Sequence, residues 1–184
     1  IKSFFSNIFE EDVGRILNRD KGIIPISDLD AYIVDISKMV AWGGTIPIGF
    51  PTSPQLSNGF LFEFDNAFHD FCKSRELSYT RYSDDIIVSG KEREVLVDLR
   101  NIVQDMLHQY ASEKLFLNVE KTRITHIGNK VKILGLVISQ NGQVTLDPKY
   151  KRTIESLLHF YLTDKVRYDN YLNKTFKGKK IHSL

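Results

Sequence analysis

The chain has 184 residues, of which 42% are hydrophobic and 26% charged, and its formal net charge is +2. This length suits one domain or little more, and the composition supplies enough apolar side chains for a packed core. The single Cys72 excludes an internal disulfide, and no run approaches the roughly 18 apolar residues of a membrane span. We therefore expect a cytoplasmic protein with no signal peptide and no membrane partner.

The charge is unevenly distributed along the chain. Residues 148–184 carry nine Lys and Arg against three acidic side chains, a net charge of +6, which leaves −4 for residues 1–147. A basic segment appended to an acidic region suits a polyanion whose backbone must be held nearby. A solvated helix face is the ordinary alternative, so charge alone favours nucleic acid without requiring it.

Two amphipathic helices are predicted first. Ser6 or Asn7 is placed to cap a helix that runs to about Asn18. Ser27, with Asp30 three residues later, imitates a capping box at the start of a second helix, which a pair of glycines is expected to end. Both helices are predicted to serve as scaffold.

A long third helix is predicted from Ser53 to Lys73, with Ser53 as its cap and Pro54 in its first turn. Apolar side chains recur along one stripe, which predicts a face packed on the core: Leu56, Phe60, Phe64, Phe68 and Phe71. The loop before it, residues 44–52, is rich in Gly and Pro. A helix N-terminus with free N–H groups beside such a turn favours a phosphate or a nucleotide sugar.

Residues 77–90 predict a β-hairpin with Asp84 and Asp85 at its tip, because two short β-rich segments flank this acidic pair. Adjacent carboxylates resist joint ionisation unless a positive charge lies close to them. Their hard oxygen atoms suit Mg²⁺. A solvated turn is the commoner role of such a pair, so the neighbouring motifs must decide between the two interpretations.

The second half of the chain alternates helix and strand. Apolar periodicity predicts a helix over 95–112 and then a strand over 131–139, in which Gly135 would mark the close approach of another backbone. A two-residue turn at Asn141-Gly142 is expected to lead into a further strand, and helices are expected from Pro148 onward. Together these elements predict an α+β fold in which an antiparallel sheet packs on helices.

Four stretches, in this order, resemble the motifs of the bacterial reverse transcriptases, the group of retron, group II intron and phage-defence enzymes: residues 46–58 (IPIGFPTSPQLSN), 82–85 (YSDD), 117–122 (LNVEKT) and 133–138 (ILGLVI). The resemblance spans nearly the whole chain, and the ordered set is far more specific than any one motif. It implies a polymerase palm over 1–147, with part of the fingers-side helices, and the beginning of a basic helical thumb over 148–184.

The resemblance also implies a metal site. Asp84, Asp85 and the backbone carbonyl of Ile1 would hold two Mg²⁺ ions, with Mn²⁺ as an alternative. The family's third carboxylate would come from an Asp directly before Ile1, so we expect this chain to be a fragment of a longer protein. Lys121 matches a Lys that protonates the departing pyrophosphate as a general acid, although an unassigned Lys is ordinarily a surface residue.

Nucleotide and primer contacts follow from the same resemblance. The residues expected to line the nucleotide pocket are Ser3, Phe4, Phe5, Gly49, Phe50 and Pro51. Phe5 matches the aromatic gate that excludes a ribose 2′-OH, and core packing is the alternative role of Phe4 and Phe5. The residues expected to contact template or primer are Thr52, Ser53, Pro54, Leu134, Gly135 and Leu136, of which the last three match the grip on the primer 3′ end.

The implied activity is that of an RNA-directed DNA polymerase that extends a DNA or RNA primer with dNTPs on an RNA template, with a cognate non-coding RNA as a further partner. One position departs from the family: Ile48 stands where many relatives carry Gln. This departure keeps open a template-independent or self-primed DNA polymerase in phage defence. A catalytically incomplete nucleic-acid-binding fragment is the other alternative, and a cyclase with a related palm is a distant third.

Overall fold

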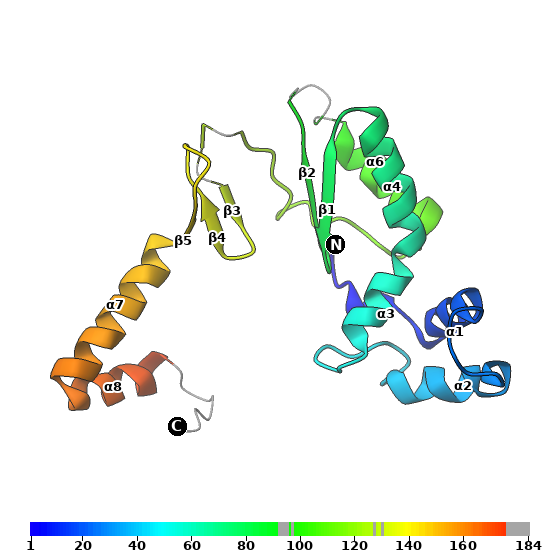
Figure 1. Cartoon of the computed structure of the whole chain (residues 1–184), viewed down its shortest axis with the longest axis horizontal. Coiled ribbons are helices and arrows are strands. Elements are labelled where there is room, and N and C mark those ends of the chain that lie inside the picture. Colours follow the sequence, from blue (N-terminus) through cyan, green and yellow to red (C-terminus); the bar gives the residue numbers. More distant parts are fainter. Residues whose placement is uncertain (92–95, 97, 127, 130, 176–184) are drawn as a thin grey trace. The chain divides into compact units, whose positions relative to one another are not determined.

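The computed structural model describes residues 1–91, 96, 98–126, 128–129 and 131–175, and the chain forms two compact units, residues 1–124 and 125–184. Figure 1 shows the elements of both units. Among the residues that the structure describes, no helix combines the length and the apolar composition that a membrane span requires.

The first unit is an antiparallel hairpin covered by helices. Strands β1 and β2 pair along their full length, α4 packs against β1, and α6 packs against α4 (Figure 1). This arrangement confirms the predicted α+β fold with an antiparallel sheet on helices. The elements are η1 (Phe5–Asn7), α1 (Glu10–Asp20), α2 (Leu29–Val40), α3 (Ser53–Phe60), α4 (Phe62–Ser74), β1 (Ser78–Tyr82), β2 (Asp85–Ser89) and α6 (Leu99–Tyr110).

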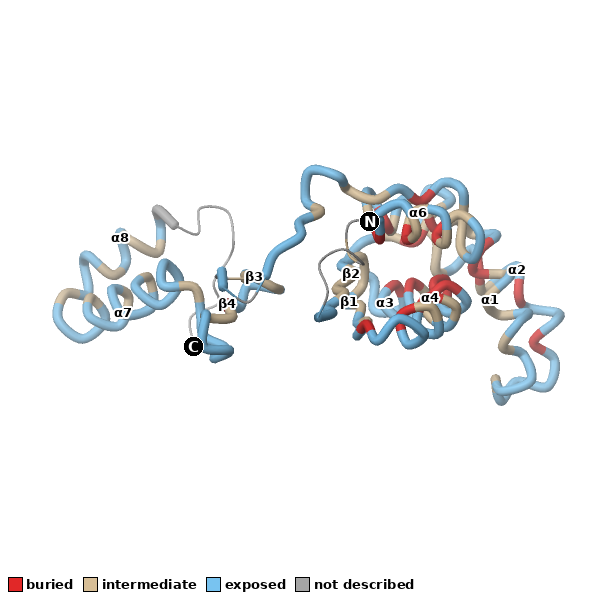
Figure 2. The backbone as a smooth tube through the Cα atoms, turned by 90° about the horizontal axis from the view of Figure 1, so that it is seen from above, coloured by how far each residue is buried: buried red, intermediate tan, exposed pale blue. Residues whose placement is uncertain are grey.

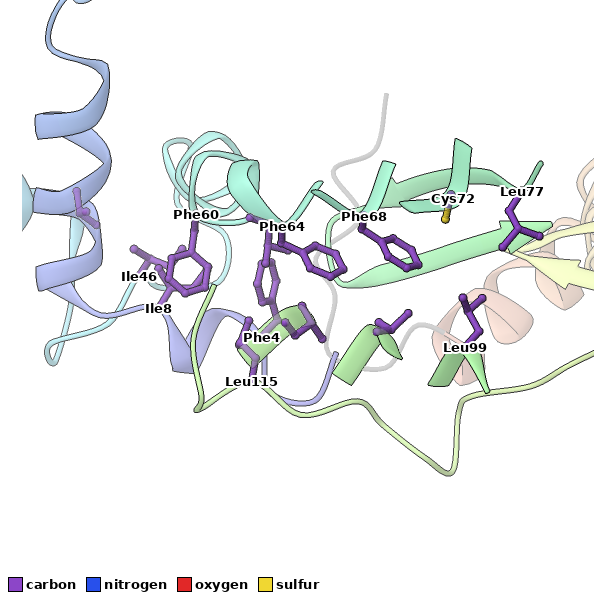
Figure 3. Packing of buried hydrophobic residues seen from close by; sticks show 14 residues of the cluster. Phe4, Ile8, Ile46, Phe60, Phe64, Phe68, Cys72, Leu77, Leu99 and Leu115 are labelled. Carbon is purple, nitrogen blue, oxygen red and sulfur yellow. The ribbon is translucent and has the colours of Figure 1, made fainter. Parts of the chain in front are cut away.

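The core of the first unit is built on the predicted aromatic stripe. Phe64 and Phe68 are completely buried and stack with ring centroids 5.4 Å apart, and the Phe68 ring meets the edge of Tyr79 at 4.8 Å. Phe4 and Leu115 pack from the opposite side of this cluster (Figure 3). The buried residues accordingly lie mainly on the helices, with three each in α2, α3, α4 and α6 and two in α1 (Figure 2).

The starts of the first two helices differ from the prediction. Residues Ser6 and Asn7 lie in the short η1 turn, and α1 begins only at Glu10, where the Asp12 carboxylate accepts a 2.7 Å hydrogen bond from the backbone N–H of Phe9. The predicted capping box at Ser27 is also wrong, because α2 begins at Leu29 without a side-chain cap. It ends at Val40, before the glycines, because residues 42–45 form a tight antiparallel bridge.

The long third helix is interrupted. At Leu61 the backbone leaves helical geometry (φ −90°, ψ 5°), which divides it into α3 and α4, and the Leu61 side chain is buried at this break. Thr52, and not Ser53, occupies the cap position. Ser53 lies inside the helix, buried, where its Oγ donates a 2.6 Å hydrogen bond to the carbonyl of Pro47. Pro54 stands in the first turn, as predicted.

The helix predicted over 95–112 is confirmed as α6 from Leu99, with Leu99, Val103 and Leu107 on its buried face. It ends at Tyr110, two residues before the predicted end. Val95, which the prediction included, lies outside the described residues.

The second unit combines a three-stranded antiparallel sheet, in the order β3-β4-β5, with two helices. Its elements are β3 (Val131–Ile133), β4 (Leu136–Ile138), β5 (Val144–Leu146), α7 (Pro148–Thr163) and α8 (Lys165–Thr175). Among its described residues Val137 is the single buried hydrophobic side chain, so its surfaces are largely exposed. The expected boundary between palm and thumb, at 147/148, falls inside this unit where β5 meets α7.

The strand predicted over 131–139 is wrong. Leu134 and Gly135 adopt left-handed backbone angles, φ +49° and +84°, and form the two-residue turn between β3 and β4. Gly135 therefore serves the turn, and among the described residues no atom lies within 4 Å of the place that a Cβ atom would take. The turn at Asn141-Gly142 is one residue longer than predicted, because the backbone N–H of Ser139 donates to the carbonyl of Gln143 across a loop that ends at Gly142 (φ +79°).

Candidate active site

The acidic pair lies at the closed end of the β1–β2 hairpin. Tyr82 pairs with Asp85, so Ser83 and Asp84 alone connect the two strands. Ser83 has φ +54°, a left-handed conformation that residues other than Gly, Asn and Asp rarely adopt. Asp84 is half-buried in the turn, whereas Asp85 is exposed as the first residue of β2. The two neighbouring carboxylates thus have different surroundings.

The first residues of the chain lie between this turn and the segment after α6. The backbone nitrogen of Ile1 donates a 2.7 Å hydrogen bond to the Asp84 carbonyl, and the backbone N–H of Lys2 donates to the Phe116 carbonyl at 2.8 Å. The backbone of Ile1 therefore lies against the turn that carries Asp84, and the backbone of Lys2 lies against the segment that precedes Lys121.

Lys121 is carried by a turn that α6 holds in place. The side-chain amide of Gln104 in α6 makes two hydrogen bonds to the backbone of the following segment. Its Nε2 donates to the Leu115 carbonyl and its Oε1 accepts from the Leu117 N–H, both at 2.8 Å. The Asn118 carbonyl then accepts the Lys121 N–H at 3.1 Å. Sequence reasoning missed Gln104, since a Gln on an amphipathic helix gives no signal of such a contact.

Behind the turn, Arg81 joins the hairpin to two helices. Its Nε donates to Asp65 Oδ1 at 2.8 Å and its Nη2 to Asp65 Oδ2, while Nη1 donates to the Ser83 carbonyl at 2.9 Å and to Asn58 Oδ1 at 3.2 Å. The Tyr79 hydroxyl donates to Asp65 Oδ1 at 2.6 Å. The Arg81 side chain is only 7% exposed, so this ion pair is largely shielded from water.

This network shifts two pKa values. Burial raises the pKa of Tyr79 well above its usual range, and the hydrogen bond to the Asp65 carboxylate raises it further. Burial acts to lower the pKa of Arg81, but the Asp65 carboxylate outweighs burial and the net shift is upward. Sequence reasoning did not find this network, although Arg81 sharing a strand face with Leu77 and Tyr79 was an available signal.

The loop before α3 is anchored at both ends and exposed between them. Ile46 is buried and its N–H donates to the Ile8 carbonyl at 3.1 Å, and Ser53 is fixed through its bond to Pro47. Between these anchors the side chains face solvent: Ile48 is 80% and Phe50 40% exposed. Gly49, Pro51, Thr52 and Pro54 are exposed as well. An exposed loop on fixed ends is available for a ligand.

The first aromatic residues have separate environments. Phe4 is buried with its ring centroid 6.5 Å from that of Phe60, so it belongs to the core, which was the alternative role considered for it. Phe5 is half-buried, with its ring 5.5 Å from Phe4, and keeps part of its surface accessible. Ser3 is exposed, and its carbonyl accepts a 2.8 Å hydrogen bond from the Asn7 amide.

Leu134, Gly135 and Leu136 belong to the second unit. There they form one side of a groove of about 500 Å³, whose other lining residues are Lys132, Leu146, Asp147, Lys149, Tyr150 and Thr153. Leu134 is 52% exposed at the tip of its turn. The groove therefore combines apolar side chains with two lysines.

Carboxylate oxygens are the donors available at the turn. Among the described residues, no group of three or more His, Cys, Asp and Glu side chains is arranged to hold a metal ion. Asp84 and Asp85 supply two carboxylates, and Mg²⁺ typically takes one or two carboxylates together with substrate phosphates and waters. This donor set fits an ion shared with a phosphate-bearing substrate, and it does not form a closed cage.

Comparisons with known proteins agree with this geometry. A sequence profile of the family described as reverse transcriptase (RNA-dependent DNA polymerase) matches residues 35–138. Similar curated proteins include three from Escherichia coli: the retron Ec83 reverse transcriptase (28% identical, covering 85% of this chain and 51% of the relative), the retron Ec86 reverse transcriptase (31%, 86% and 50%) and the retron Ec73 reverse transcriptase (27%, 90% and 54%). The chain thus spans about half the length of these relatives.

Proposed function

The chain belongs to the reverse transcriptase (RNA-dependent DNA polymerase) family, and we propose that it forms the palm, and the beginning of the thumb, of an RNA-directed DNA polymerase of the retron type. The observation that carries this proposal is the contact of the Ile1 backbone with the turn that holds Asp84 and Asp85, in a chain whose residues 35–138 match this family. Paired carboxylates can hold the metal ions of nucleotidyl transfer, and a Lys can serve as its general acid.

Asp84 and Asp85, with the carbonyl of Ile1, would hold divalent ions, which we expect to be two Mg²⁺, with Mn²⁺ as a substitute. When bound, such ions activate a primer 3′-OH and neutralise charge at the α-phosphate of the incoming dNTP. The half-buried position of Asp84 and the exposed position of Asp85 support a division of labour, in which Asp84 is the more rigidly oriented ligand.

Lys121 would donate its Nζ proton to the pyrophosphate as it leaves. Its turn is fixed through Asn118 and its side chain is exposed, so the ammonium is free to reach a phosphate. The nucleotide pocket would be lined by the exposed part of the loop before α3, Gly49, Phe50 and Pro51, and by the first residues of the chain. There Ser3 and the buried Phe4 would contribute their backbone, and Phe5 its side chain. Phe5, which keeps accessible surface, is the candidate for sugar selection.

Template and primer contacts would come from two places. Thr52, Ser53 and Pro54 begin α3 beside the exposed loop, and buried Ser53 would act by holding that loop in shape. Leu134, Gly135 and Leu136 would grip the primer through the β3–β4 turn, and α7 and α8 would begin a basic thumb. The similarity to retron reverse transcriptases supports an RNA template, a DNA or RNA primer and a cognate non-coding RNA as partners.

Primer extension tests this proposal. The full-length protein would be given a primed RNA template, Mg²⁺ and dNTPs, beside an Asp84→Asn variant and a matched control, Asp70→Asn, which changes an exposed Asp on α4. We expect template-copied DNA from the wild type and the control and none from Asp84→Asn. Product unrelated to the template would favour a template-independent polymerase, and absence of product from the wild type would contradict the proposal.

A further inference from the structure

We propose that Arg81 is a positioning residue for this active site, which fixes the orientation of Asp84 by holding the Ser83 carbonyl. The inference rests on the proposed function, because it assigns Asp84 to the catalytic centre. It concerns a side chain that points away from the reacting atoms, into the contact between the hairpin and helices α3 and α4.

The anchor of Arg81 is rigid. Its guanidinium binds both oxygens of Asp65 on α4 and the side-chain oxygen of Asn58 on α3. Asp65 directly follows Phe64, whose completely buried side chain fixes this part of the backbone to the core. The Tyr79 hydroxyl donates to the same Asp65 oxygen as Arg81 Nε, but it makes no contact with the Ser83 carbonyl, which Arg81 Nη1 holds.

The turn that Arg81 contacts needs such support. Ser83 adopts φ +54° within a two-residue connection, although it carries a Cβ atom that disfavours this conformation. The peptide group between Ser83 and Asp84 contains the Ser83 carbonyl, which accepts a 2.9 Å hydrogen bond from Arg81. The peptide group after it contains the Asp84 carbonyl, which the Ile1 nitrogen holds at 2.7 Å. With both flanking peptide planes fixed, the direction of the Asp84 Cα–Cβ bond is fixed too.

The shape of the guanidinium is essential to this role. Its Nε and Nη2 are used by Asp65, which leaves Nη1 directed at the Ser83 carbonyl and Asn58. A Lys keeps the charge but has a single nitrogen, which cannot occupy these three places at once. The substitution Arg81→Lys therefore separates the positioning contact from the charge.

The test compares Arg81→Lys with wild type and with Tyr79→Phe, a matched control that removes one hydrogen bond to Asp65 and leaves the Ser83 contact. In full-length protein, we expect Arg81→Lys to raise the Mg²⁺ concentration for half-maximal primer extension by about 10- to 100-fold, the range for residues that orient metal ligands. Tyr79→Phe should stay within about twofold of wild type, since it loses one hydrogen bond outside the turn.

A second readout does not need chemistry. Binding of Mn²⁺ to the full-length protein, followed by electron paramagnetic resonance, should weaken in Arg81→Lys by a similar factor and remain unchanged in Tyr79→Phe. If the wild type binds Mn²⁺ but extends no primer, the proposed polymerase function fails, and the Mn²⁺ titration still decides the role of Arg81.

Two results would overturn the inference. The first is a folded Arg81→Lys variant whose dependence on Mg²⁺ and Mn²⁺ is that of the wild type. The second is an equal loss of metal affinity in Arg81→Lys and Tyr79→Phe, which would show that the network only stabilises the fold. Circular dichroism establishes folding. Should Arg81→Lys not fold, Asp65→Asn replaces it, because it keeps the side-chain shape while weakening the anchor. The same increase in the Mg²⁺ requirement is expected there, and an unchanged requirement would contradict the inference.

Discussion

Asp84 and Asp85 are neighbours in sequence, but the hairpin gives them unequal surroundings. Asp84 lies half-buried in the turn, where the Ser83 carbonyl accepts a hydrogen bond from Arg81 and the Asp84 carbonyl accepts one from the Ile1 nitrogen. Asp85 already belongs to β2, opposite Tyr82, and its side chain is exposed. A ligand with a fixed direction is the better metal ligand, because little reorganisation accompanies binding.

We therefore expect the two carboxylates to differ in their effects. In full-length protein, Asp84→Asn should lower kcat by roughly three orders of magnitude or more, since a metal-dependent step loses its oriented ligand. Asp85→Asn should lower kcat less. Steady-state primer extension, with primer–template affinity measured separately, checks both values. Equal losses, or a larger loss in Asp85→Asn, would show that the turn does not distinguish the two residues.

Tyr79 gives a prediction about pH. Burial and the Asp65 carboxylate raise its pKa in the folded protein above the ordinary value of 10.0. A group whose pKa is raised on folding stabilises the protein fully below its unfolded pKa, and this stabilisation is lost as pH rises toward the folded pKa. Between about pH 8 and about pH 10 the contribution of Tyr79 should be constant, and above about pH 10 it should decline.

Urea unfolding of wild type and Tyr79→Phe at several pH values measures this contribution. The difference in the free energy of unfolding between the two proteins should shrink as pH rises from about 10 to about 11. Because the other tyrosines and lysines are common to both proteins, their titration cancels in the difference. A difference that stays constant over this interval would contradict the assigned pKa shift.

Among the elements, the β3–β4 turn is unusual for its first residue. Leu134 adopts φ +49° and its side chain is 52% exposed, so its backbone conformation is unfavourable and its apolar side chain is not buried. Left-handed geometry costs about 1–2 kcal/mol for such a residue. An exposed Leu in this conformation leaves an apolar side chain available for a contact, as the proposed grip on the primer requires.

Replacing Leu134 by Asn, which tolerates left-handed angles, should separate stability from function. We expect Leu134→Asn to raise the stability of the β3–β4 hairpin by about 0.5–1 kcal/mol, measured by hydrogen exchange of its amides. The KM for primer–template should rise at the same time. Val144→Asn is the control, since Val144 is exposed in β5 without a positive φ and should lose stability instead. Leu134→Asn with a wild-type KM would argue against the primer contact.

Sequence patterns succeeded where local chemistry determines the element. The Phe stripe, the hairpin around Asp84 and the helices after Pro148 all follow from periodicity or turn residues close in the chain. The turn at Leu134 was missed because an apolar run with Leu at a left-handed position reads as one continuous strand. The break at Leu61 was missed as well, because a buried Leu gives no local signal that a helix is interrupted.

The site was predictable only in part, for a related reason. The resemblance proposes Asp84, Asp85 and Lys121 as site residues, and the structure places the Asp84 carbonyl against the Ile1 nitrogen. Arg81 supports the turn of Asp84 from its ion pair with Asp65, and Gln104 supports the segment that leads to Lys121. Both act across contacts that only the tertiary fold creates. Spacing in one sequence carries no information about such pairs.

At the scale of the whole molecule, the charge asymmetry has a structural counterpart. The basic residues of α7 and the start of α8 are exposed, and they alternate with exposed aromatic and apolar side chains such as Tyr150 and Tyr161. A helix face that only contacts water is usually composed of polar and charged side chains, whereas this one also exposes aromatic rings. Cations interleaved with aromatic rings suit a nucleic-acid backbone with accessible bases, which favours the thumb interpretation over an ordinary charged surface.

The salt dependence of binding tests this last interpretation. Each Lys or Arg that neutralises a phosphate contributes about 0.7–0.9 to the slope of log K against log salt concentration. Replacing Lys149, Lys151 and Arg152 together by Ala should therefore reduce that slope by about 2–3 for a primed template bound to the full-length protein. The KM for primer–template should rise while kcat stays near the wild-type value, because these side chains hold the duplex and do not touch the reacting atoms. Lys73→Ala, which changes an exposed Lys near the end of α4, should leave the slope unchanged. A reduced kcat with an unchanged slope would instead assign the first turn of α7 to the chemistry and remove the argument for a thumb.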